Sequence, residues 1–147
     1  MLSKLLLISG MLVLPLAAAG GVDDAWKNLL ALNGEWQGDG RKAVVTYTIV
    51  SGGSVVMERM QVPSEPDMVT MYHRDGTGLV ATHYCSMGNQ PRMRAPEADA
   101  KTIRFRFADI TNLKPGDGHI KDLTVAFRTR ITSRRSGPAS KTARSRQ

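Results

Sequence analysis

The stretch AVVTYTIVSGGSVVMERMQ, residues 43–61, decides the fold class of this chain. Its first part places Val45, Tyr47 and Ile49 on one side of an extended segment and valine and threonines on the other, which is the two-residue period of a β-strand. The segment Ser51-Gly52-Gly53 then supplies the backbone freedom of a tight turn, and Ser54–Gln61 runs back as a second strand. The stretch therefore predicts an antiparallel hairpin.

The same pattern continues along the chain. Turn-forming residues separate further strands, predicted at 68–73, 79–85, 101–110 and 121–127, while the polar stretch 86–100 is predicted to be a long connection. If the loop 74–78 closes symmetrically, Val69 pairs with His83. Asp23–Leu32 is predicted to be a short helix with an apolar stripe. Residues 22–127 therefore indicate an all-β domain, an antiparallel up-and-down barrel or sandwich with one N-terminal helix.

The net charge of +7 is unevenly distributed. Seven of the 20 basic residues follow Phe127 and one is Lys4, which leaves the rest of the chain with twelve basic and thirteen acidic residues. A nearly neutral domain offers no electrostatic field for phosphates. We therefore expect no nucleic-acid partner, although Arg104 and Arg106 alternate with phenylalanines as in an RNA-binding strand.

The first 19 residues read as a secretory signal peptide. Lys4 provides the positive start, Leu5–Leu16 the apolar centre, and Ala17-Ala18-Ala19 the small residues before a cleavage site. A membrane anchor is the alternative, but the apolar stretch is shorter than the roughly 20 residues that span a bilayer. We expect a periplasmic or secreted protein without a stable anchor. Its single cysteine, Cys85, allows no intramolecular disulfide.

Two motifs resemble a known group of proteins. The segment GEWQGDG, residues 34–40, looks like the Gly-x-Trp that opens the first strand in the calycin superfamily, and its glycine spacing is closest to the nitrobindin-like branch. The block MVTMYH (68–73), THYC (82–85) and GNQPRM (88–93) resembles uncharacterised exported bacterial proteins of lipocalin-like type. The resemblance implies a small barrel with an internal cavity and no particular activity. Nitrobindin-like proteins bind haem through a histidine near the C-terminus, and the tail from Arg128 onward has none.

The candidate ligand-binding residues are Trp36, Tyr47, His83, Tyr84 and Arg92. Imidazole, phenol and guanidinium groups, together with the Asn89 amide, could converge at a barrel mouth and orient a carboxylate or carbonyl ligand. Alternatively, His83 is a core or surface histidine and Arg92 pairs with an acidic residue. Methionines in the domain suit an apolar cavity or a plain core. No metal site, known cofactor or particular oligomer is indicated.

Three functions follow from these residues. The first is an exported module that binds a small apolar or amphipathic ligand. The second is a barrel enzyme that uses His83 as acid or base, with Tyr84 or Arg92 polarising a carbonyl. The third is a haem protein of nitrobindin type. Binding without catalysis is the preferred hypothesis.

The segment after Phe127 departs from the pattern of the domain. FRTRITSRRSGPA, residues 127–139, can be encoded by a nucleotide string whose shifted frame reads PDADHFTQEWTC, which looks like the continuation of the resembling proteins. We therefore interpret residues 128–147 as a disordered basic tail, the product of a shifted reading frame. The barrel is then expected to be incomplete, with an exposed edge at residues 121–127.

Overall fold

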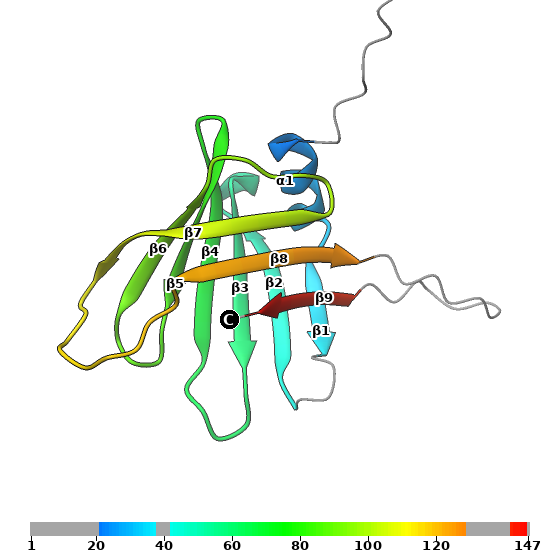
Figure 1. Ribbon diagram of the computed structural model, residues 1–147. Coiled ribbons are helices and arrows are strands. Elements are labelled where there is room, and N and C mark those ends of the chain that lie inside the picture. Colours follow the sequence, from blue (N-terminus) through cyan, green and yellow to red (C-terminus); the bar gives the residue numbers. More distant parts are fainter. Residues whose placement is uncertain (1–20, 38–41, 129–141, 147) are drawn as a thin grey trace, which may run out of the picture.

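The computed structural model describes residues 21–37, 42–128 and 142–146. The described chain forms one helix, one short 3-10 turn and nine strands (Figure 1). In chain order these are α1 (Val22–Leu30), β1 (Gly34–Gln37), β2 (Val44–Val50), η1 (Ser51–Gly53), β3 (Val55–Gln61), β4 (Met68–Asp75), β5 (Gly78–Tyr84), β6 (Gln90–Ala95), β7 (Thr102–Thr111), β8 (Asp122–Arg128) and β9 (Thr142–Arg146).

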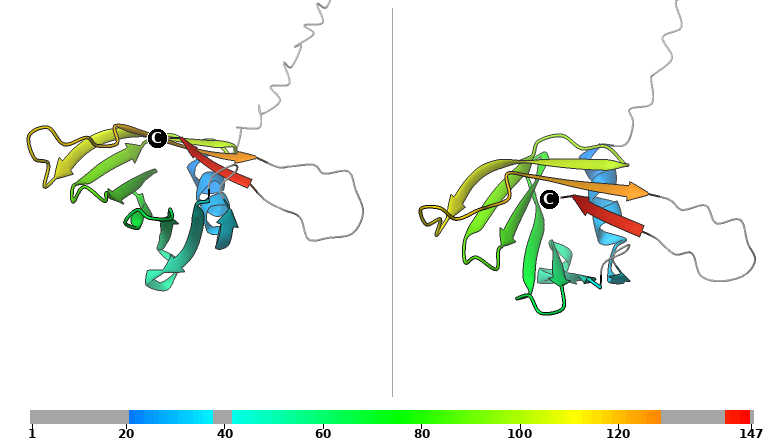
Figure 2. Two further views of the ribbon diagram at one scale, coloured as in Figure 1. Left: turned by 90° about the horizontal axis from the view of Figure 1, so that it is seen from below. Right: turned by 60° about the horizontal axis from the view of Figure 1, so that its bottom comes forward.

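The strands make a single antiparallel sheet in which each pairs with its neighbours in the sequence, in the order β1 to β9. The sheet curls into an open half-barrel (Figure 2). Within the described residues no ladder joins β9 back to β1. This confirms the prediction of an incomplete, antiparallel up-and-down barrel with one short N-terminal helix.

Helix α1 closes one end of the half-barrel. Ala25, Trp26 and Leu29 are buried on one side of the helix, as its apolar stripe predicts. Their neighbours are the core side chains of the concave sheet face, among them Val56, Tyr72, Leu79, Ala81, Met93, Ala95, Ile103, Phe105, Leu123 and Val125. On the rim, Asn28 Nδ2 donates to the Ala100 carbonyl oxygen at 2.7 Å. The closed end is therefore filled by packed side chains.

The hairpin between β4 and β5 differs from its predicted register by one residue. β4 extends to Asp75, which pairs with Gly78, so the turn contains only two residues. Gly76 adopts a left-handed conformation with φ of 57°, as tight hairpin turns require. His83 consequently pairs with Thr70 and not with Val69. The sequence prediction was wrong here because it assumed a five-residue loop.

β6 lies inside the stretch that was predicted to be a connection. Met93 and Ala95 are buried while Arg92 and Arg94 are exposed, which is the alternation of a strand with one solvent face. Its proline and the preceding glycine suggested a loop. Pro91 is instead the second residue of β6 and is fully buried. The shorter strand β1 was likewise not predicted separately from its glycine-rich motif.

The C-terminal prediction is corrected in one part. β8 was expected to be an exposed edge, but it pairs with β9, with Phe127 opposite Ala143 and Val125 opposite Ser145. Residues 142–146 are therefore a strand and not part of a disordered tail. Residues 129–141 and 147 lie outside the described chain, as does the predicted signal peptide. Within the described ranges, no helix has the length and apolar character needed to cross a membrane.

Candidate functional site

A row of polar side chains crosses the concave face of the sheet. The strand register places Tyr47 opposite Glu58, Glu58 opposite Thr70, and Thr70 opposite His83. Directly paired residues point to the same side of an antiparallel sheet. All four are buried, with 3 to 6% of their surface exposed. We call Tyr47, Glu58, Thr70 and His83 the polar row.

Glu58 is at the centre of the row. The hydroxyl of Tyr72, the next inward residue of β4, donates to Glu58 Oε2 at 2.7 Å, and the Tyr47 hydroxyl also donates to this carboxylate. Burial raises the pKa of Glu58, and the two tyrosine donors partly offset that effect. Burial, reinforced by the Glu58 charge, raises the pKa of Tyr47 and Tyr72 far above the usual range. Both tyrosines are therefore neutral donors.

His83 forms the other end of the row. Its Nδ1 atom lies 3.0 Å from Thr70 Oγ1. Burial lowers the pKa of the imidazole, so the ring is neutral near pH 7. Its other nitrogen, Nε2, is buried and has no hydrogen-bond partner within the described chain. A buried polar atom without a partner costs free energy, which makes this nitrogen a candidate binding group.

Asn89 carries a second such atom. The residue is fully buried in the turn between β5 and β6, where its backbone oxygen accepts from the Cys85 amide at 3.1 Å. Its Nδ2 donates to the Gly118 carbonyl oxygen at 3.0 Å. Its Oδ1 has no partner among the described residues. Asn89 thus ties the β5–β6 turn to the segment that leads into β8.

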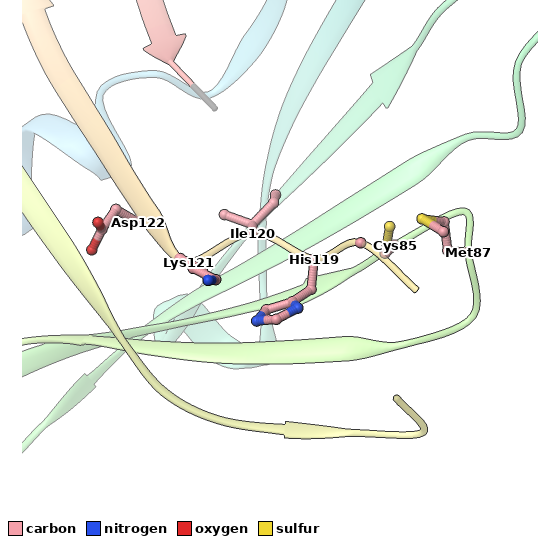
Figure 3. Close-up of a pocket in the computed structure, with 7 residues that line it drawn as sticks. Cys85, Met87, His119, Ile120, Lys121 and Asp122 are labelled. Atoms are coloured by element: carbon pink, nitrogen blue, oxygen red, sulfur yellow. The ribbon is translucent and has the colours of Figure 1, made fainter. Parts of the chain in front are cut away.

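A pocket of about 460 Å³ opens at this end of the half-barrel (Figure 3). One wall is made by the end of β5 and its turn, the other by the segment entering β8; the lining residues are Cys85, Met87, Gly118, His119, Ile120, Lys121 and Asp122. Ile120 also packs against the core cluster, and the His119 ring lies 5.3 Å from the ring of Phe107. The pocket therefore adjoins the interior at the end opposite α1.

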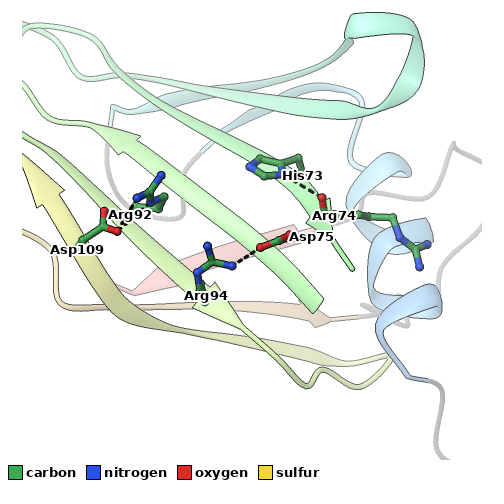
Figure 4. A network of polar contacts seen from close by, with 6 residues as sticks. All are labelled: His73, Arg74, Asp75, Arg92, Arg94 and Asp109. Atoms are coloured by element: carbon green, nitrogen blue, oxygen red, sulfur yellow. Dashed lines mark hydrogen bonds and ion pairs between the residues drawn. The ribbon is translucent and has the colours of Figure 1, made fainter. Parts of the chain in front are cut away.

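Two predicted site residues lie outside the interior. Arg92 is on the convex face, where its Nη2 bonds Asp109 Oδ2 at 2.5 Å, and nearby Arg94 pairs with Asp75 (Figure 4). The hydrogen bond and charge of Asp109 raise the pKa of Arg92. Tyr84 is 47% exposed and alternates with His83 to the opposite face. The expected convergence of His83, Tyr84, Asn89 and Arg92 was therefore wrong, because successive strand residues face opposite sides.

The other predicted residues face inward. Tyr47 belongs to the polar row, and Trp36 is half-buried against the core with its Nε1 donating to the Leu32 carbonyl oxygen at 2.7 Å. Sequence reasoning missed Glu58, Thr70 and Tyr72. The alternation of β3 placed Glu58 on the same side as Val56, and that signal was available. Within the described chain, no three histidine, cysteine or acidic side chains lie together as metal ligands would.

Comparison with known proteins does not assign this chain to a family. No protein-family model matches the chain, and neither a curated protein nor a solved structure matches it.

Proposed function

We propose that this chain is an exported β half-barrel that binds a small apolar or amphipathic molecule at its open end. The observation that carries the proposal is the polar row inside the half-barrel. A core that served stability alone would be made of apolar side chains, because burying each polar group costs free energy of desolvation. A carboxylate, a neutral imidazole and two tyrosines buried together are typical of a functional site. Cys85, two residues beyond His83, lines the pocket.

The pocket supports a ligand of modest size. Its volume of about 460 Å³ is in the lower part of the range of roughly 300–1,000 Å³ for small-molecule sites. Met87 and Ile120 give it apolar walls, and methionine adapts to ligands of different shape. The closed end is packed with side chains, which supports a ligand position at the end near His83.

Titration with 1-aminoanthracene, a neutral fluorescent probe of apolar sites, tests the proposal on the full chain. We expect saturable binding, lost in a Gly118→Leu variant that fills the pocket. A Cβ atom at residue 118 would lie 3.9 Å from Met87 Sδ, in ordinary contact, so the added side chain extends into the pocket. Arg92→Leu adds the same side chain on the convex face and serves as the control. Equal binding by both variants would exclude this pocket.

The two alternative functions use the same imidazole. A haem protein requires a free ring nitrogen, and His83 Nε2 is one; haem addition would then give a Soret band that His83→Phe abolishes. An enzyme would lose turnover in that variant, whereas a binding module would at most change its affinity. Export is tested separately: expression in a bacterial host should give a periplasmic product whose N-terminus follows Ala19.

A further inference from the structure

Two buried atoms without partners lie on the same side of one hairpin. His83 and Asn89 are 3% and 0% exposed, and both His83 Nε2 and Asn89 Oδ1 lack a hydrogen-bond partner within the described chain. The backbone bond from Cys85 to Asn89 continues the β5–β6 ladder to the end of the hairpin. Cys85 is two residues beyond His83 and therefore shares its face of β5. Asn89, paired with Cys85, therefore lies on the same inner face of the hairpin as His83, and Cys85 lines the pocket.

The free atom of Asn89 is an acceptor. Its amide nitrogen donates to Gly118, and a carbonyl oxygen cannot donate to that position. This bond fixes the orientation of the amide, because the flipped amide would place two acceptors together. Oδ1 therefore needs a donor.

The free nitrogen of His83 completes the pair. The other ring nitrogen, Nδ1, lies 3.0 Å from Thr70 Oγ1, a hydroxyl that can either donate or accept in this contact. A neutral ring that donates from Nδ1 has an acceptor at Nε2.

We infer that the neutral His83 ring carries its proton on Nδ1, and that the polar end of the ligand is a hydrogen-bond donor, a hydroxyl or an N–H group, held by His83 Nε2 and Asn89 Oδ1. This inference rests on the proposed function and names its ligand class. It replaces the expectation of a carboxylate or carbonyl ligand, which depended on Arg92. Arg74, the inner-facing cation of β4, pairs with Asp23 beside the closed end. Lys121 lines the pocket, and so does Asp122, a carboxylate of opposite charge. Glu58 further disfavours an anion near the row.

Two isomers of the same composition test this preference. Octan-1-ol can donate a hydrogen bond, whereas heptyl methyl ether, with identical atoms, can only accept; octanoate adds the negative charge. Each is titrated against bound 1-aminoanthracene. We expect the alcohol to bind about tenfold more tightly than the ether, the difference between a satisfied and an unsatisfied buried acceptor. Octanoate should bind more weakly than the alcohol.

Matched variants locate the effect. His83→Phe should remove most of the alcohol's advantage, while His73→Phe, the same change on the convex face of β4, should retain it. Equal affinity for alcohol and ether, or tighter binding of octanoate, would overturn the donor inference and leave the proposed function standing. Failure of all three compounds and of 1-aminoanthracene to bind would remove the proposed function and this inference with it.

A second measurement needs no variant. The ¹⁵N shifts of the His83 ring in the wild-type protein distinguish a protonated from an unprotonated nitrogen. We expect a proton on Nδ1 and none on Nε2 at pH 7.5. A proton on Nε2 would make that atom a donor and overturn the inference.

Discussion

Replacing Tyr72 with phenylalanine removes one oxygen atom from the centre of the buried network. The ring keeps its place, since its centroid lies 5.7 Å from that of Phe105 and both side chains are fully buried. The change deletes the 2.7 Å hydrogen bond to Glu58 and leaves a buried carboxylate with one donor fewer. A hydrogen bond to a charged group contributes about 1.5–3 kcal/mol, so we expect a loss of about 2 kcal/mol in the free energy of unfolding.

Urea denaturation followed by tryptophan fluorescence measures this loss, because Trp26 is buried in α1. With a urea dependence of about 2 kcal/mol/M, the midpoint should fall by about 1 M. Tyr84→Phe, the same chemical change at an exposed residue of β5, should change the free energy of unfolding by less than about 0.5 kcal/mol. If the two variants have equal midpoints, the hydrogen bond from Tyr72 to Glu58 does not stabilise the fold.

A double-mutant cycle assigns the loss to this pair. Glu58→Gln keeps the shape of the side chain and removes its charge. The cost of Tyr72→Phe in that background should be about 1 kcal/mol smaller than in the wild type, because the lost bond is then neutral. Additive costs would show that Tyr72 acts through packing alone.

Three further predictions use the same denaturation assay. In the Glu58→Gln background, the free energy of unfolding should decrease as pH falls below about 6.5. The reason is that burial lowers the imidazole pKa of His83 in the folded state, so the unfolded state takes up the proton first. If adding His83→Phe leaves this pH dependence unchanged, His83 is not the group responsible. Gly78→Ala should cost about 1–3 kcal/mol, since its Cβ would lie 2.9 Å from the Ala95 carbonyl oxygen; an unchanged midpoint would contradict that close approach. Arg92→Ala should leave the urea midpoint and the binding of 1-aminoanthracene unchanged, because the ion pair of Arg92 is exposed to solvent. A loss of probe binding in this variant would show that Arg92 belongs to the binding site.

Strand alternation made most of the fold predictable. The segments 43–50 and 101–110 showed their inner and outer faces in sequence, and the structure buries Tyr47, Ile103 and Phe105 accordingly. β6 was missed because proline and glycine dominate its surroundings, although Met93 and Ala95 alternate with arginines. β9 pairs through backbone groups, which an arginine- and serine-rich sequence does not reveal.

The candidate site was less predictable, because it depends on turn length. A two-residue turn after Asp75 sets His83 opposite Thr70, while the assumed five-residue loop sets it opposite Val69. Composition alone does not distinguish these registers. Closeness in sequence was also misleading, since Tyr84 and His83 are adjacent but face opposite sides of the sheet. Hydrogen-bond partners such as Glu58 and Tyr72 come from different strands and require the register to be known.

The plug formed by α1 has a consequence for selectivity. Because packed side chains occupy the half-barrel beneath the helix, the ligand of the proposed function cannot enter past α1, and its polar end would go in first to reach His83 and Asn89. The remainder of the molecule would then lie along Met87 and Ile120, which line the pocket. Such a site would select ligands by the chemistry of one end and by the cross-section of the chain, and it would tolerate tails of different length.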